Sequence, residues 1–378
     1  MRRVPRRIYF DNASTTNIHP EVLKTYEELL ERFYVNSESL YDEGSEISRM
    51  MEKARGAIAG LLGVNMQDII FTSGSSESNT AAIKGVCFAG SRKHILTTSI
   101  EHSSIMNCCA QMHDVFGYDV TYLPVDASGS VKLEDVKKAL REDTAIVSVM
   151  AVNNETGAIN PIEEIAAYVK KHSHAYMHTD LTQAIGKIRI DLKDVDLASI
   201  SAHKLEGLKG SGILIRRQHV PFVPLINGGE QEEGLRGGTS NACVNMIFAK
   251  TLRLALENGK RSHAYVESLS QRLREGLLKI KGIEINSPAN AACGFINFSY
   301  ENIPSEVMQN ALNRQGFQVS ARSTCASRSN DPSYVLKAMG FSDRRASSCI
   351  RVSLARQNTE EEVDLFLKVL KEITEQYG

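Results

Sequence analysis

Short apolar runs alternate with helical patterns between about residues 68 and 217, and this alternation restricts the fold more than any other feature. The expected strands are residues 69–72, 95–98, 145–152, 175–179, 197–201 and 212–215. Continuous apolar strands separated by helices are typical of a parallel sheet covered on both faces. The pattern predicts an α/β fold in which ligands bind beyond the carboxyl ends of the strands.

Beyond about residue 251 the pattern changes to long helices and short strands such as 294–299. The sequence also indicates where the last helix begins. Thr359 and Glu362 have the spacing of a capping box, and apolar residues follow at helical spacing. This part predicts a smaller α+β domain. We expect a large domain over residues 15–250 and a small domain over 1–14 and 251–378.

Composition excludes several classes of partner. The 44 basic and 45 acidic residues give a net charge of -1, so bulk charge favours neither nucleic acid nor a membrane surface. We find no apolar stretch of roughly 18 residues and no signal-peptide pattern after the basic residues 1–7, which predicts a cytoplasmic protein. None of the seven cysteines has zinc-site spacing, so we expect no metal, and most of them should be buried.

Two charged residues end neighbouring expected strands. Asp180 follows the run at 175–179, and Lys204 lies 24 positions later in Ser-Ala-His-Lys after the run at 197–201. A lysine that forms a Schiff base and an acid that partners the ring nitrogen are what pyridoxal phosphate requires. The pair therefore predicts a pyridoxal phosphate site, in which the protonated ring acts as an electron sink.

Residues 72–78, Thr-Ser-Gly-Ser-Ser-Glu-Ser, follow one expected strand and open a helix. Backbone N–H groups and hydroxyls in such a segment can hold a phosphate at the positive end of the helix dipole. A capped helix start has the same composition. Together with Asp180 and Lys204 in one sheet, the segment favours a cofactor site.

Four other polar residues are candidates for the chemistry. His102 could stack on the cofactor ring and move protons, or be a surface or core histidine. Asn154 and Gln183 could bond the cofactor's phenolic oxygen or the substrate, or be turn and helix-start residues. Arg351 lies in an apolar run, where a carboxylate from the protein or from an amino-acid substrate would offset the cost of burial.

Cys325 lies in residues 321–330, a small, polar stretch with two arginines that predicts an exposed loop. Nearby positive charge favours the nucleophilic thiolate. A free surface cysteine can also be incidental.

Taken together, these segments resemble, over nearly the whole chain, the cysteine desulfurases of the NifS/IscS type. These are class-V aminotransferases with the aspartate-aminotransferase-like fold of pyridoxal phosphate enzymes. The matching segments are residues 9–16, 72–78, 101–104, 152–155, 178–183, 201–204, 228–232, 234–239, Cys325, 332–336 and 351–354.

The resemblance implies conversion of L-cysteine to L-alanine, with a persulfide formed on Cys325 for a sulfur-acceptor protein of iron-sulfur cluster assembly or tRNA thiolation. It implies Lys204 as the Schiff-base lysine, Asp180 on the ring nitrogen, and a homodimer. The remaining implied roles are His102 stacked on the ring, Gln183 on the phenolic oxygen, Ser75, Ser76, Ser201, His203 and a partner subunit's Thr239 at the phosphate, Asn154 at cofactor and substrate, and Arg351 and Asn12 at the substrate.

The chain also departs from the family pattern. The departures are residues 205–208 after the lysine, Glu233, Tyr41 and Thr324. They leave substrate preference, subunit contacts and partner docking open. The sequence as a whole also leaves open the identity of the acceptor, the choice between cysteine and selenocysteine, and a relay of sulfur through another cysteine. The alternatives are an aminotransferase or lyase of the same fold that acts on another amino acid, and a desulfurase-like scaffold without turnover.

Overall fold

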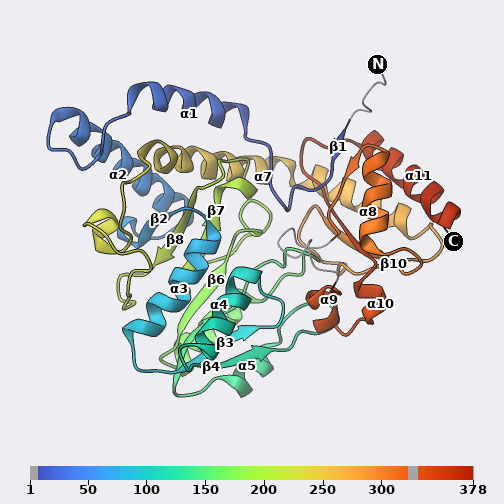
Figure 1. The fold of residues 1–378 in the computed structure, drawn as a ribbon, viewed down its shortest axis with the longest axis horizontal. Coiled ribbons are helices and arrows are strands. Elements are labelled where there is room, and N and C mark those ends of the chain that lie inside the picture. The colour runs from blue at the N-terminus through green and yellow to red at the C-terminus, as the bar shows by residue number, and fades with distance from the viewer. Residues whose placement is uncertain (1–6, 322–330, 378) are drawn as a thin grey trace.

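A seven-stranded sheet forms the centre of the larger part of the molecule in a computed structural model that describes residues 7–321 and 331–377 (Figure 1). The strand order is β2-β8-β7-β6-β5-β3-β4. Only β8 runs antiparallel to its neighbours. The strands are Ile69–Thr72 (β2), His94–Thr98 (β3), Asp119–Leu123 (β4), Thr144–Ser148 (β5), Tyr176–Asp180 (β6), Leu197–Ser201 (β7) and Gly212–Arg216 (β8). The predicted α/β fold with a mostly parallel sheet is confirmed.

Helices cover both faces of this sheet, which explains why its central strands are apolar throughout. In β5, Ile146 packs in a cluster with Ile83 of α3, while its neighbour Val147 packs on the opposite face with Ile165 of α6. The helices of this part are Pro20–Arg32 (α1), Asp42–Leu62 (α2), Ser75–Ala89 (α3), Ser103–Asp114 (α4), Leu133–Ala139 (α5) and Ile162–His172 (α6).

Two details differ from the sequence prediction. The strand expected at 145–152 ends at Ser148, because the chain leaves the sheet and forms a bridge between Val152 and Ile159. Strand β4 was not expected. It lies at the edge of the sheet and only Leu123 is buried, so it carries no continuous apolar run.

The C-terminal part has its own apolar core around two smaller sheets. An antiparallel sheet joins β12 (Cys349–Ser353), β10 (Phe295–Tyr300) and β9 (Ile283–Ile285), and β1 (Ile8–Tyr9) pairs in parallel with β11 (Phe317–Gln318). The helices are Ala242–Leu277 (α7), Ser305–Arg314 (α8), Tyr334–Ala338 (α9), Asp343–Ala346 (α10) and Glu360–Tyr377 (α11). Within the described residues, no helix is long and apolar enough to cross a membrane.

The capping box predicted for the last helix is present. The Glu362 N–H donates to Thr359 Oγ1 and the Thr359 N–H donates to Glu362 Oε2, each at 3.3 Å. Phe366 and Leu370 of this helix are fully buried in the C-terminal core.

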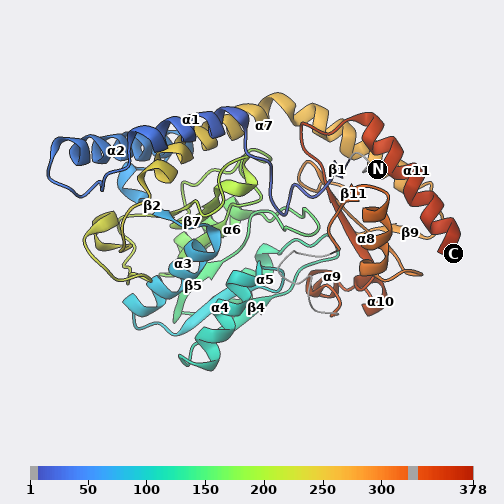
Figure 2. The same ribbon diagram turned by 45° about the horizontal axis from the view of Figure 1, so that its top comes forward.

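Helix α7 belongs to both cores and runs from one part of the molecule to the other (Figure 2). Its Phe248 packs against the large sheet, and its Leu269 packs in the C-terminal core. The N-terminal segment also connects the cores, since Phe10 packs in the C-terminal core and Ala13 in the large one. We therefore propose the division into residues 15–250 and residues 1–14 with 251–378, with α7 continuous across residue 250.

Two glycines bring the start of α3 against the start of β8. A Cβ on Gly212 would lie 2.5 Å from the Gly74 Cα, and Gly74, with φ of 148°, has a conformation that other residues rarely adopt. The backbone at the start of α3 therefore contacts the sheet where β8 begins, beside the last residue of β7.

We expect Gly212→Ala to destabilise the protein by ~1–3 kcal/mol, because the new methyl group overlaps backbone that cannot move aside. The measurement is the free energy of unfolding from denaturant titration. Gly60→Ala is the matched control, since a Cβ at this helical position meets nothing within 4 Å and should be neutral or stabilising. Equal effects of the two substitutions would contradict the close approach.

Candidate active site

Asp180, the last residue of β6, is a buried carboxylate held by two donors. The Thr182 N–H donates to its Oδ1 at 2.8 Å, and the Asn79 side-chain amide donates to its Oδ2 at 2.8 Å. These two bonds fix the orientation of the carboxyl group at the carboxyl end of β6.

Lys204 lies at the end of the short helix Ala202–Lys204 (η2), immediately after β7. Its amine donates to the carbonyl oxygens of Ala13 and Ser14, the latter at 2.6 Å. The Gln183 side-chain amide donates to the same Ala13 oxygen at 2.9 Å. The structure thus brings Lys204 and Gln183 together against the N-terminal segment.

A chain of hydrogen bonds connects Asp180 to His102. The Asn79 amide that bonds Asp180 also donates to Ser104 Oγ at 2.9 Å, and Ser104 Oγ lies 2.9 Å from His102 Nδ1. His102 caps α4, since its Nδ1 also accepts from the Ser104 N–H at 3.2 Å. Sequence reasoning missed Asn79 and Ser104, because no local pattern relates Asn79 to a carboxylate 101 residues away.

The start of α3 has the features of an anion site. No side chain caps this helix, which leaves first-turn N–H groups at Ser75 and Ser76 for another acceptor. A Cβ at Gly74 would lie 3.5 Å from Ser201 Oγ, so this hydroxyl lies beside the helix start. The structure therefore places Ser201 next to the predicted phosphate segment.

His203 contacts the N-terminal segment, with its Nδ1 3.2 Å from Thr15 Oγ1. Burial, and then the positive charge of Lys204, lower the pKa of His203 to about 4. The ring is therefore neutral at pH 7.

The carboxylate that pairs with Arg351 of β12 belongs to the protein itself and is that of Asp11. The guanidinium donates to Asp11 Oδ1 at 2.7 Å, to Ser14 Oγ at 2.6 Å and to the Asn154 carbonyl at 2.6 Å. Sequence reasoning required such a partner but did not name Asp11.

Several buried polar atoms around Arg351 and Lys204 have no hydrogen-bond partner in the described part of the chain. They are Arg351 Nε and the side-chain oxygens of Asn12, Asn154 and Gln183. Buried polar groups are normally paired. Their number here indicates a site for a polar ligand.

Two predicted residues stay apart from this group. Thr239 is exposed, as a residue that acts in a second copy would be, and its role stays a prediction. Cys325 lies outside the described residues.

The six described cysteines are buried, as expected. Burial raises the pKa of Cys108 to about 11 and that of Cys293 to about 12.

Glu101, next to His102, is fully buried. Its Oε1 accepts from Thr98 Oγ1 and from the Met150 N–H, both at 2.8 Å. Burial raises the pKa of this carboxyl to about 8. The side chain therefore holds a proton at neutral pH, beneath the residue predicted to stack on the cofactor.

The model of the aminotransferase class-V family matches residues 8–366. A protein named cysteine desulfurase IscS from Methanosarcina thermophila is 39% identical, over 98% of this chain and 92% of its own. A mitochondrial cysteine desulfurase of Arthroderma benhamiae is 41% identical over 97% of this chain and 74% of its own. A solved NifS-like protein superposes with a TM-score of 0.91 and 39% identity, and the match covers 98% of this chain and 100% of that one.

The chain belongs to the class-V aminotransferase family. The aspartate-aminotransferase-like fold and the family predicted from the sequence are thereby confirmed. Class-V aminotransferases use pyridoxal 5'-phosphate, which confirms the predicted cofactor. The residues present fit it, because an uncapped helix start, a fixed carboxylate, a lysine amine and unpartnered amide oxygens all lie beyond the strand ends.

We expect Asn79→Leu to weaken cofactor binding by ~10–100-fold, because hydrogen bonds to charged groups contribute ~1.5–3 kcal/mol and Asp180 and Ser104 both lose a donor. The measurement is the dissociation constant of pyridoxal phosphate from visible absorbance. The exposed Asn313→Ala is the control and should bind as wild type does. Wild-type affinity in Asn79→Leu would show that Asp180 does not depend on this bridge.

The raised pKa of Glu101 predicts a pH-dependent stability. Between the ordinary carboxyl value of roughly 4.3 and about 8, folded chains hold a proton that unfolded chains have released, so stability falls as the pH rises through this range. Glu101→Gln is neutral at every pH and lacks this effect. The melting temperature of wild type relative to Glu101→Gln should therefore fall between pH 5 and pH 8.

For this comparison the exposed Glu27→Gln is the control, and its melting temperature should follow that of wild type. A constant difference between wild type and Glu101→Gln from pH 5 to pH 8 would mean that Glu101 is ionised throughout.

Proposed function

We propose that this chain is a pyridoxal-phosphate-dependent cysteine desulfurase that converts L-cysteine to L-alanine and forms a persulfide on Cys325. The observation that carries the proposal is the similarity of about 40% identity over nearly the full chain to proteins named cysteine desulfurase. Its support in the structure is the placement of Asp180 and Lys204 at the ends of neighbouring strands.

When bound, pyridoxal phosphate supplies an electron sink. Asp180, fixed by Asn79 and Thr182, holds the proton on the ring nitrogen. At the other end, Ser75, Ser76, Ser201 and His203 bind the phosphate. His203 is neutral, and contact of its Nδ1 with Thr15 Oγ1 holds the ring against the N-terminal segment.

Arg351 binds the substrate carboxylate through its unpartnered Nε, while Asp11 keeps its bond to Nη2. Asn12 and Asn154 orient the substrate from the same side. Lys204 Nζ then takes the proton from the substrate Cα, and His102 moves protons at the sulfur. His102 suits this role because Nδ1 accepts from the Ser104 N–H, so a neutral ring carries its proton on Nε2.

Cys325 accepts the sulfur, a role transferred from the resemblance. Its thiolate forms an S–S bond to the substrate sulfur as the bond between that sulfur and carbon breaks, so the carbon skeleton leaves as alanine. The burial and raised pKa of Cys108 and Cys293 favour Cys325 over these thiols as nucleophile.

The protein acts as a cytoplasmic homodimer, in which Thr239 of one subunit reaches the phosphate in the other. The exposure of Thr239 in a single chain supports this arrangement. The persulfide passes to a sulfur-acceptor protein of iron-sulfur cluster assembly or tRNA thiolation. The names of the IscS relatives favour the first of these acceptors.

We expect wild type with L-cysteine and a reductant to release alanine and sulfide in equal amounts. Cys325→Ala should release neither product above ~1% of the wild-type rate while it keeps the yellow cofactor, because chemistry on the cofactor does not need the thiol. Lys204→Ala should lose both turnover and the visible band. Cys243→Ala, which changes a buried thiol, is the control and should turn over normally.

Wild-type turnover in Cys325→Ala would contradict the sulfur acceptor. A keto acid in place of alanine would favour an aminotransferase, and cofactor colour without turnover would favour a scaffold.

A further inference from the structure

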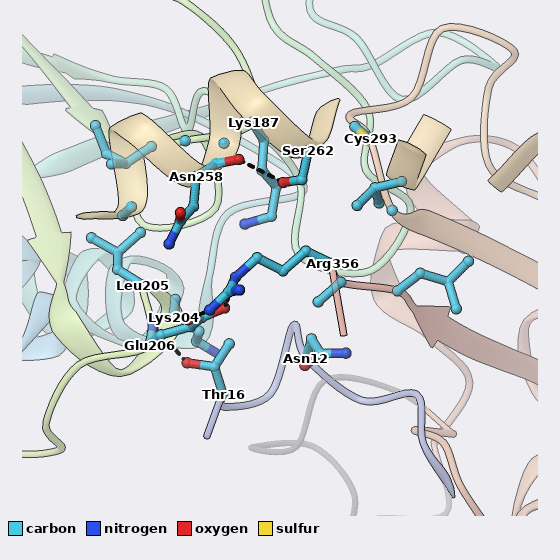
Figure 3. Close-up of a pocket in the computed structure, with 18 of the residues that line it drawn as sticks. Asn12, Thr16, Lys187, Lys204, Leu205, Glu206, Asn258, Ser262, Cys293 and Arg356 are labelled. Carbon is cyan, nitrogen blue, oxygen red and sulfur yellow. Dashed lines mark hydrogen bonds and ion pairs between the residues drawn. The ribbon is translucent and has the colours of Figure 1, made fainter. Parts of the chain in front are cut away.

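A second cavity, here called the α7 pocket, lies between α7 and residues 12–16 (Figure 3). It encloses about 120 Å³. Apolar residues from both parts of the molecule line it, among them Leu254, Val266, Phe295 and Leu354. The pocket therefore lies at the junction of the two cores.

The α7 pocket adjoins the predicted cofactor site but is built mostly from other residues. Of all the residues proposed to hold cofactor or substrate, only Asn12 and Lys204 line it. Asp180, His102 and Arg351 do not. Residues 12–16 form the wall between the two sites, because the Ala13 and Ser14 carbonyls accept from Lys204 while Asn12, Ala13 and Thr16 line the pocket.

Lys187 places a charge in this apolar space. Figure 3 shows its side chain pointing into the pocket, where Nζ lies 5.7 Å from the centre of the Phe295 ring. Across residues 7–321 and 331–377, no hydrogen bond or ion pair to this amine is found. Burial lowers the pKa of Lys187 to about 8, so most of the amine is charged at pH 7.

The other charges of the pocket leave Lys187 without a counter-charge. Arg356 and Glu206 pair with each other through two bonds of 3.0 and 2.7 Å. Cys293 is a neutral thiol, since burial raises its pKa to about 12. Lys187 is partly buried, and a charge that is partly removed from water without a counter-charge is destabilised, so an anion would offset that cost.

We propose that the α7 pocket binds a small carboxylate with an apolar body, of the class of aromatic monocarboxylates. The carboxylate accepts from Lys187 Nζ, and the ring packs against Phe295, Leu254 and Val266. The volume of about 120 Å³ is of the same order as the ~150 Å³ of an apolar cavity that holds benzene, so a single ring is the largest apolar body that the pocket admits. Charge complementarity selects an acid over a neutral compound of the same shape.

Calorimetric titration of the holoenzyme with sodium benzoate tests the proposal. We expect one site per chain with a dissociation constant of about 1 mM, and at least tenfold weaker binding of benzamide, which has the same shape without the charge. Lys187→Met should weaken benzoate binding at least tenfold. Lys193→Met, at an exposed lysine, is the matched control and should leave it unchanged.

Two further measurements keep the test decisive. Ser262→Leu fills the pocket and leaves the charge in place, so it should weaken benzoate binding even if Lys187→Met fails to fold. Saturating L-alanine occupies the substrate site and should leave benzoate binding intact. Absence of benzoate binding at about 10 mM, wild-type binding in Ser262→Leu, or displacement by L-alanine would each overturn the proposal. None of these results depends on desulfurase turnover.

Discussion

The buried ion pair between Arg351 and Asp11 is the interaction on which the site depends. Arg351 is only 2% exposed, and in the C-terminal core an unpaired guanidinium would be strongly destabilising. Asp11 and Ser14 offset this cost at 2.7 and 2.6 Å, and both belong to the N-terminal segment. Folding of the C-terminal core therefore fixes residues 11–14.

The same segment positions Lys204. The Ala13 N–H donates to Ser353 Oγ of β12 at 2.8 Å, while the Ala13 carbonyl accepts from Lys204 and from Gln183. One short stretch of backbone thus sets where the lysine of the large sheet lies relative to the arginine of the small one. An amino-acid substrate requires this, because its carboxylate and its Cα proton lie on adjacent atoms and must meet both residues at once.

The sequence could predict the ends of β6 and β7, and with them Asp180 and Lys204, because buried parallel strands leave continuous apolar runs that polar residues terminate. It could not predict the antiparallel direction of β8, which has the same apolar character as its parallel neighbours. Nor could it pair Asn79 with Asp180, since the two residues meet only through the packing of α3 on the sheet.

Lys187 was missed for a related physical reason. A single lysine near a turn is usually solvated, whereas here α7, which crosses from one core to the other, helps to place this one in an apolar pocket. Arg351 differs, because its neighbours in sequence are apolar. The sequence alone therefore indicates that its charge is buried and needs a partner. Sequence reasoning can identify a buried charge when the apolar residues around it are its neighbours in the sequence. It misses such a charge when the surrounding residues come from distant segments.

Residues 11–16 have one side toward Arg351 and Lys204 and another toward the α7 pocket. Thr16 extends this link, since it donates to the His203 carbonyl at 2.9 Å and accepts from the Glu206 N–H at 2.8 Å. Glu206 has a left-handed backbone, with φ of 58°, and its bonds to Arg356 help to hold that strained conformation. Because both bonds of Thr16 go to residues within two positions of Lys204, the position of Lys204 and the wall of the α7 pocket are set by the same backbone.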